Sequence, residues 1–376
     1  MTIHQIIFIT LFTLIMGGMN LYIYRRFFRQ LSPLTHHIGA VVTVLLMLGE
    51  LLFVLDRLTG WLPDSAPLYM LLTTAVGLSF MLFMVALFYD LTITTSRRVP
   101  FDQQRRRAIK MVFDLTVLTA AIAYLLRGFV EGARPPRINR VAVTIPDFPQ
   151  DGFTIVQLSD VHVGHTIRRP FMEETVARVN ALQPDLVVIT GDLFDRTANR
   201  IIADLEPLRD LVAPTYFVTG NHEYFRGVEQ ALAVLRTLDV MPLTNQHQVI
   251  TLEQGRFNLL GVNDLVGERF GAEPFDIEAA YAGLDSTLPT IVLSHQPKSI
   301  PHFEGRRCDL MLSGHTHGGQ IFPFGLLVKL DQPYVAGLYR HNAAQQIFVS
   351  RGTGYWGPPI RVLAPSEISQ LVIQRS

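Results

Sequence analysis

The sequence predicts an α/β layered domain with mixed sheets, preceded by a membrane region of about four apolar helices. Long apolar segments crowd into the first 130 residues, and from Phe153 onward short apolar strands alternate with helical patterns. In addition, Asp, His and Asn directly follow five of these strands. We therefore divide the 376 residues into a membrane region (1–130), a linker with a first edge strand (131–149) and a C-terminal domain (150–376).

Four apolar segments make up the predicted membrane region. A spanning helix needs about 20 mostly apolar residues, a length that the first and third segments reach. The second is slightly short and carries Glu50, and the fourth is short and carries Asp114. Their succession with polar links nevertheless favours membrane spans over buried core helices. The segments are Ile6–Tyr24, Ile38–Leu55, Leu68–Leu91 and Met111–Leu126.

Loop charge predicts the orientation of these segments. Arg25, Arg26 and Arg29 follow the first segment, and a second basic cluster between residues 97 and 110 follows the third. The positive-inside rule places both links in the cytoplasm, so the C-terminal domain is expected on the extracytoplasmic side of the inner cell membrane. Four arginines between residues 127 and 140 oppose this orientation. If the fourth segment does not span, the domain faces the cytoplasm instead.

Charge and cysteine content exclude some classes of protein. Residues 1–140 carry 14 Lys and Arg against 7 Asp and Glu, whereas the remaining residues carry 18 against 25. This split argues against a nucleic-acid binder with one continuous basic face. Because Cys308 is the only cysteine, the chain forms no internal disulfide and no cysteine-ligated zinc site.

Short apolar runs predict the strands of the C-terminal domain, with helices between them. Helical spacing of apolar residues predicts a helix over Pro170–Leu182, with Pro170 suited to its first turn, and a second over Gly227–Leu238. The predicted strands are Arg140–Thr144, Thr154–Leu158, Leu186–Thr190, Tyr216–Thr219, Phe257–Gly261, Ile291–Leu293, Leu310–Leu312, Gln346–Ser350 and Ile368–Ile373.

Five short pieces rich in Asp, His and Asn follow predicted strands. Oxygen donors and imidazoles from several strand ends can converge on metal ions, and this mixed set suits Mn, Fe, Zn, Co or Ni better than Ca or Mg alone. Two such ions clamp a phosphoryl group and activate a bridging water. The pattern therefore predicts a metal-dependent phosphate-ester hydrolase. The pieces are Asp160–His162, Gly191–Asp195, Gly220–Glu223, Ser294–His295 and Gly314–His317.

Three residues in these pieces have predicted roles from their chemistry. Asp192 has two carboxylate oxygens and is the natural bridge between two ions. His222 is a candidate acid for the leaving oxygen, with Asp195 positioned to orient its ring. A helix N-cap explains an aspartate at position 195 equally well, so both interpretations of Asp195 stay open.

All five pieces occur in the order typical of the calcineurin-like metallophosphoesterase superfamily. The chain resembles its bacterial membrane-associated or exported phosphodiesterases, which carry LSDxHxG, GHTHGGQ and SRGxG…PxR motifs. These correspond here to Leu158–Gly164, Gly314–Gln320 and Ser350–Arg361. The resemblance covers roughly residues 138–376 and implies a β-sandwich flanked by helices, a four-layer αββα fold.

The resemblance also implies which residues hold two divalent metal ions. Ligands to one ion are expected to be Asp160, His162, Asp192 and His317. Ligands to the other are expected to be Asp192, Asn221, His295 and His315. His222 is expected to contact the phosphate as the acid.

We therefore expect a membrane-anchored, two-metal phosphoesterase whose substrate is a phosphodiester or a lipid-linked phosphate. The expected partners are this substrate and the membrane, with no nucleic acid. A rival hypothesis is a catalytically silent metal-binding sensor or scaffold of the same fold, against which the complete ligand set argues. The aromatic loop Tyr355–Pro359 has two interpretations, a loop over the site or at lipid, and a segment that closes the fold.

Overall fold

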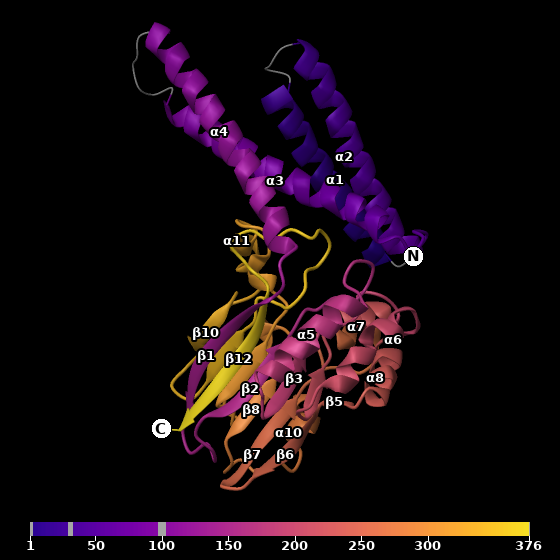
Figure 1. The fold of residues 1–376 in the computed structure, drawn as a ribbon, viewed down its shortest axis with the longest axis vertical. Coiled ribbons are helices and arrows are strands. Elements are labelled where there is room, and N and C mark those ends of the chain that lie inside the picture. Colours follow the sequence, from indigo (N-terminus) through magenta and orange to yellow (C-terminus); the bar gives the residue numbers. More distant parts are fainter. Residues whose placement is uncertain (1–2, 29–32, 97–102, 376) are drawn as a thin grey trace. The chain divides into compact units, whose positions relative to one another are not determined.

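A computed structural model describes residues 3–28, 33–96 and 103–375. The chain forms two compact units (Figure 1). The helical unit comprises Met1–Ala133 together with Gly357–Val362, and the α/β unit comprises Arg134–Trp356 and Leu363–Ser376. Residues 29–32 and 97–102, which contain part of the predicted basic links, lie outside the described residues.

Four long helices form the helical unit. They are α1 (Ile3–Ile23), α2 (Pro33–Thr59), α3 (Ala66–Ser96) and α4 (Gln103–Gly132), with a short π-helix at Tyr24–Phe28. Within α2 and α3, His36–Asp56 and Ala66–Leu91 are long and apolar enough to cross a membrane. Spans in α1 and α4 stay predictions.

A buried polar cluster connects three of these helices. The side-chain amide of Asn20 in α1 donates to both carboxylate oxygens of Glu50 in α2, at 2.9 Å each. The hydroxyl of Ser79 in α3 donates to the Asn20 side-chain oxygen at 3.1 Å. Polar side chains among apolar helices find partners on neighbouring helices, and this cluster therefore fixes the relative register of α1, α2 and α3.

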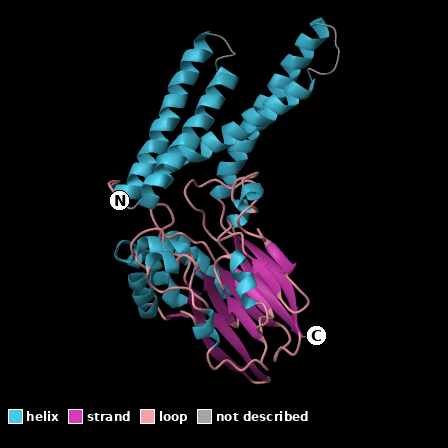
Figure 2. Cartoon of the chain, turned by 180° about the vertical axis from the view of Figure 1, so that it is seen from behind, coloured by secondary structure: helices cyan, strands magenta, loops and turns pink. Residues whose placement is uncertain are grey.

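Two six-stranded sheets form the centre of the α/β unit (Figure 2). The first has the order β1-β12-β2-β3-β4-β5 and the second the order β10-β11-β9-β8-β7-β6. The first contains β1 (Arg137–Ile145), β2 (Phe153–Leu158), β3 (Leu186–Thr190), β4 (Thr215–Val218), β5 (Val240–Pro242) and β12 (Glu367–Arg375). The second contains β6 (Gln246–Leu252), β7 (Gly255–Gly261), β8 (Thr290–Leu293), β9 (Leu310–Ser313), β10 (Gly337–Arg340) and β11 (Gln346–Val349).

Helices pack on the outer faces of both sheets, which gives the expected αββα layers. Apolar residues of α5, α6 and α8 share a core with the first sheet, and those of η3 and α10 share one with the second. The helices are α5 (Arg169–Ala181), α6 (Ala198–Leu205), α7 (Asn221–Arg226), α8 (Val228–Thr237), α9 (Gly267–Phe270), α10 (Ile277–Tyr281) and α11 (Gly325–Val328). The 3-10 helices are η2 (Glu206–Asp210), η3 (Pro297–Phe303) and η4 (His317–Gly319).

Alternating side chains explain how one strand serves two cores. In β3, Leu186 and Val188 belong to the core between the sheets, whereas Val187 and Ile189 belong to the core under the helices. This follows from the two-residue period of a strand. Strands buried on both faces appear in the sequence as continuous apolar runs, which is why these strands were predictable.

The topology gathers the strand ends that carry polar residues. Strands β2, β3 and β4 are parallel neighbours in the first sheet, and β8 and β9 are parallel neighbours in the second. Every predicted strand is present with similar bounds, and the predicted fold class is confirmed. Three strands, β5, β6 and β10, were not predicted from the sequence. They are short or partly exposed strands at the sheet edges.

Candidate metal centre

Five loops at strand ends supply the candidate ligands. Asp160 follows β2, Asp192 follows β3, His295 follows β8 and His315 follows β9, each within two residues of the strand. Asn221 lies three residues after β4 and begins α7. The carboxyl ends of central strands are the usual position of a binding site in α/β sheets, and residues far apart in the sequence meet there.

Unusual backbone conformations mark this edge of the sheets. Asp160, His162, Asp192, His315 and His317 all have positive φ, between 50° and 69°. Non-glycine residues rarely adopt this left-handed region, and each instance costs on the order of 1–3 kcal/mol. Such residues cluster at functional sites because the surrounding structure holds them there.

Two glycines allow the loops to touch. A Cβ atom at Gly191, which has a φ of +83°, would lie 2.6 Å from the Gly220 backbone nitrogen and 2.7 Å from His295 Nδ1. A Cβ at Gly314 would lie 1.9 Å from the Ser159 hydroxyl oxygen. A side chain at either position would therefore push apart the loops that carry the candidate ligands.

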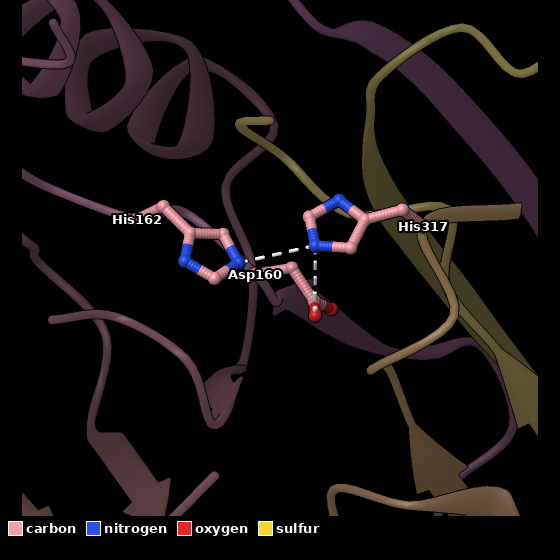
Figure 3. A group of neighbouring side chains, drawn as sticks. All are labelled: Asp160, His162 and His317. Atoms are coloured by element: carbon pink, nitrogen blue, oxygen red, sulfur yellow. Dashed lines mark hydrogen bonds and ion pairs between the residues drawn. The ribbon is translucent and has the colours of Figure 1, made fainter. Parts of the chain in front are cut away.

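One group of candidate ligands consists of Asp160, His162 and His317 (Figure 3). The Nε2 atoms of His162 and His317 lie 3.0 Å apart, and His317 Nε2 lies 3.5 Å from Asp160 Oδ1. All three residues are buried. Two imidazole nitrogens directed at one point beside a carboxylate form a donor set suited to a cation.

A second group consists of Asp192, His295 and His315. His295 Nε2 lies 3.3 Å from Asp192 Oδ2 and 3.2 Å from His315 Nδ1. The same Asp192 oxygen lies 3.8 Å from Nε2 of His162 in the first group, while Asp192 Oδ1 accepts the His222 backbone N–H at 2.8 Å. A single oxygen, Oδ2, is therefore placed to bridge the two groups.

Asn221 is a further candidate ligand by a different observation. Its side-chain oxygen Oδ1 is buried and has no hydrogen-bond partner among the described residues. An unsatisfied buried acceptor costs about 1–3 kcal/mol. The amide oxygen of Asn221 is therefore available as a neutral donor to a metal ion.

Burial sets the protonation states of the histidine ligands. It lowers the pKa of both His162 and His315 to about 3, so both imidazoles are neutral at physiological pH. Burial alone would also lower the pKa of His295, but the Asp192 carboxylate raises that pKa well above its ordinary value. A metal ion must therefore displace a proton from His295, so that metal binding releases a proton.

His222 lies beside the candidate ligands, with Asp195 behind it. Its Nδ1 atom is 3.0 Å from Asp195 Oδ1, and its ring centroid is 4.5 Å from that of His162. The N-cap residue of α6 is Thr197, and the Asp195 carboxylate lies within hydrogen-bond distance of His222. The geometry favours the orienting interpretation of Asp195 over the capping one.

Sequence reasoning assigned no role to Glu223, although the structure gives it a central position. The buried Glu223 carboxylate accepts backbone N–H groups from Asp192, Leu193, Phe194 and Gly220, at 2.6–3.0 Å. Burial and the nearby Asp192 charge raise the pKa of Glu223, whereas the hydrogen bonds from the Phe194 and Gly220 backbones lower it and favour the charged carboxylate. The available signal was a glutamate at the third position of a helix, which is typical of a capping box.

Comparisons with known proteins agree with this geometry. The model of the calcineurin-like phosphoesterase family matches residues 153–319. The chain is 39% identical over 332 residues to an uncharacterized metallophosphoesterase of Helicobacter pylori, with 87% of each chain covered.

Two further proteins are similar to this chain. A transmembrane protein with metallophosphoesterase domain from Danio rerio is 36% identical over 278 residues, which cover 70% of this chain and 64% of that protein. Among solved structures, the phosphopantetheinyl hydrolase of Mycobacterium tuberculosis aligns with a TM-score of 0.35 and 16% identity, over 56% of this chain and 97% of that one.

Proposed function

Because this chain belongs to the calcineurin-like metallophosphoesterase family, we propose that it hydrolyses a phosphate ester at a dinuclear metal centre. The observation that carries the proposal is the position of Asp192 Oδ2, which lies near histidine nitrogens of both ligand groups. A carboxylate oxygen shared between two N/O donor sets suits a pair of divalent ions.

The candidate ligands divide into two sets, one for each ion. When bound, two divalent ions of Mn, Fe, Zn, Co or Ni supply charge stabilisation and an activated water. Asp160, His162 and His317 are positioned to hold one ion. Asp192, His295 and His315 are positioned to hold the other, with Asn221 as an added oxygen donor.

His222 is the proposed acid in this reaction. Asp195 Oδ1 lies 3.0 Å from His222 Nδ1, so the carboxylate accepts a hydrogen bond from Nδ1–H and fixes the ring. Nε2 is then the nitrogen that delivers a proton to the leaving oxygen. Asp195 acts through His222 and is a positioning residue.

The proposed membrane attachment limits the classes of substrate that the enzyme would meet. Two helices are apolar and long enough to span a bilayer, and relatives include proteins named as transmembrane. We propose a phosphodiester or lipid-linked phosphate that the enzyme meets at the membrane, with the α/β unit on the extracytoplasmic side. Nucleic acid is not a proposed partner, because the chain after residue 140 carries a net negative charge.

Metal-restored hydrolysis tests the proposed function. The full chain in detergent is stripped of metal, supplied with each candidate ion in turn, and assayed with bis-p-nitrophenyl phosphate and p-nitrophenyl phosphate. We expect turnover to be lost on stripping and restored by at least one ion. A protein that binds two ions and hydrolyses neither substrate would contradict the proposal and favour the sensor or scaffold alternative.

The proposed orientation has a separate test. A reporter enzyme that is active only outside the cytoplasm, fused after Gly132 at the end of α4, is expected to be active. The same reporter fused after Thr59, at the end of α2, provides a matched extracytoplasmic control. Activity at Thr59 without activity at Gly132 would place the α/β unit in the cytoplasm.

A further inference from the structure

Half-exposed aromatic rings flank the proposed acid His222. The Phe225 and Trp356 ring centroids lie 5.4 Å and 6.2 Å from that of His222. Phe225 is 50% exposed and Trp356 is 43% exposed. Phe270, which is also half-exposed, packs on Phe225 with a centroid separation of 5.6 Å. All of these residues belong to the α/β unit.

The fold fixes these rings relative to the acid. His222 and Phe225 are three residues apart on α7 and therefore share one helix face. The backbone of Trp356 forms two hydrogen bonds with the side chain of Gln320, as donor at 3.0 Å and acceptor at 2.9 Å. Gln320 directly follows η4, which contains the candidate ligand His317. The aromatic rings are thus anchored to the same loops as the metal centre.

The proposed reaction specifies what approaches these rings. The leaving oxygen must come within about 3 Å of His222 to receive its proton. His162 packs against one side of His222, and the half-exposed Phe225 and Trp356 also lie beside it. We therefore expect the remainder of the leaving alcohol to extend past these two rings. Covering half-exposed aromatic surface is favourable for an apolar group and offers little to a small neutral group that stays hydrated.

We propose that Phe225 and Trp356, with Phe270 behind Phe225, form a subsite for an apolar body on the leaving alcohol. This inference rests on the proposed function. The subsite selects phosphate esters whose alcohol carries a flat or aliphatic group close to the ester oxygen. A nucleoside and an acyl lipid share that chemistry, whereas small neutral polar alcohols lack it.

Scattered apolar residues on a protein surface are common and need no ligand. Met241, at 45% exposed, is of this kind and lies on the edge strand β5 of the first sheet. The aromatic trio differs because Phe225 packs on both Phe270 and the proposed acid, and Trp356 packs on the acid as well. Met241 therefore provides a matched control residue.

A series of n-alkyl phosphate esters tests the subsite. From propyl upward the pKa of the leaving alkanol is nearly constant, so differences in kcat/KM report binding of the alkyl chain. We expect kcat/KM to rise about two- to fourfold for each added methylene until the subsite is filled. Phe225→Ala and Trp356→Ala are expected to flatten this rise, Phe225→Leu to retain part of it, and Met241→Ala to leave it unchanged.

Binding without turnover provides a second readout. The chain contains two tryptophans, so Trp61→Phe leaves Trp356 as the only one. Octyl phosphonate, whose C–P bond resists hydrolysis, is expected to shift Trp356 emission, whereas methyl phosphonate is not. A thymidine phosphonate in a parallel titration separates a nucleoside preference from an aliphatic one.

Failure of this inference is distinguishable from failure of the proposed function. Equal kcat/KM for all chain lengths, or no change in Trp356 emission at octyl phosphonate concentrations that inhibit turnover, would overturn the subsite and leave the hydrolase intact. Absence of metal-restored hydrolysis for the whole series would overturn the hydrolase, and the subsite with it.

Discussion

Asp192→Ala is expected to abolish metal-restored hydrolysis and to release bound metal. The Oδ2 atom of Asp192 lies near ligands of both groups, so its loss removes a donor from each ion at once. Loss of a single electrostatic contact in an active site typically costs about 10²- to 10³-fold in kcat, and we expect a larger decrease here. The measurements are kcat with the best restoring ion and metal content per chain.

Two companion variants separate chemistry from folding. Asp192→Asn retains an oxygen for the His222 backbone N–H, which Asp192 Oδ1 accepts at 2.8 Å, and removes the bridging charge. We expect it to fold and to bind metal weakly. Asp210→Ala removes an exposed carboxylate at the end of η2 and should behave as wild type. Two tightly bound ions and normal turnover in Asp192→Ala would show that the site assignment is wrong.

Much of the fold follows from local sequence because the central strands are buried on both faces. Leu186–Thr190 is a continuous apolar run between Asp185 and Gly191, and the observed strand has these bounds. The edge strand β10 spans four residues and buries none of them completely, so no apolar run marks it. The pairing of β1 with β12 joins segments about 230 residues apart, and no local pattern specifies such a contact.

The sequence predicts the candidate ligands of the site. It does not predict the backbone conformation that holds them in place. Spacing and residue type placed Asp160, Asp192 and His295 at strand ends. The left-handed backbone at Asp160 and Asp192 depends on loops that meet only in the folded chain. The aromatic loop Tyr355–Pro359 had two interpretations, and its residues fall in different units. Trp356 contacts His222, whereas Gly357–Val362 groups with the helices.

Glu223→Gln is expected to lower stability and weaken metal binding together. One carboxylate oxygen of Glu223 accepts the N–H groups of Leu193 and Phe194, and the other accepts those of Asp192 and Gly220. A glutamine must direct its own NH₂ group at one of these donor pairs. Two buried N–H groups then lose their acceptor, at about 1–3 kcal/mol each.

This loss is large compared with the stability of a folded domain. The expected decrease in the free energy of unfolding is about 2–6 kcal/mol, against a total of about 5–15 kcal/mol for a typical protein. For a unit of this size the loss corresponds to a fall in Tm of roughly 5–20 °C. Thermal unfolding of the full chain in detergent measures it, with Glu229→Gln at the exposed start of α8 as the matched control.

The metal content of the Glu223→Gln protein shows whether Glu223 holds the metal ligands in position or stabilises only the fold. The N–H of Asp192 is one of the four groups that Glu223 holds, and Asp192 has the positive φ that places its Oδ2 between the ligand groups. Below its reduced Tm, Glu223→Gln is therefore expected to remain folded and to bind metal more weakly. Glu223→Asp keeps both oxygens on a shorter side chain and should recover part of both losses. Wild-type metal affinity in a destabilised Glu223→Gln protein would show that Asp192 keeps its position without this carboxylate.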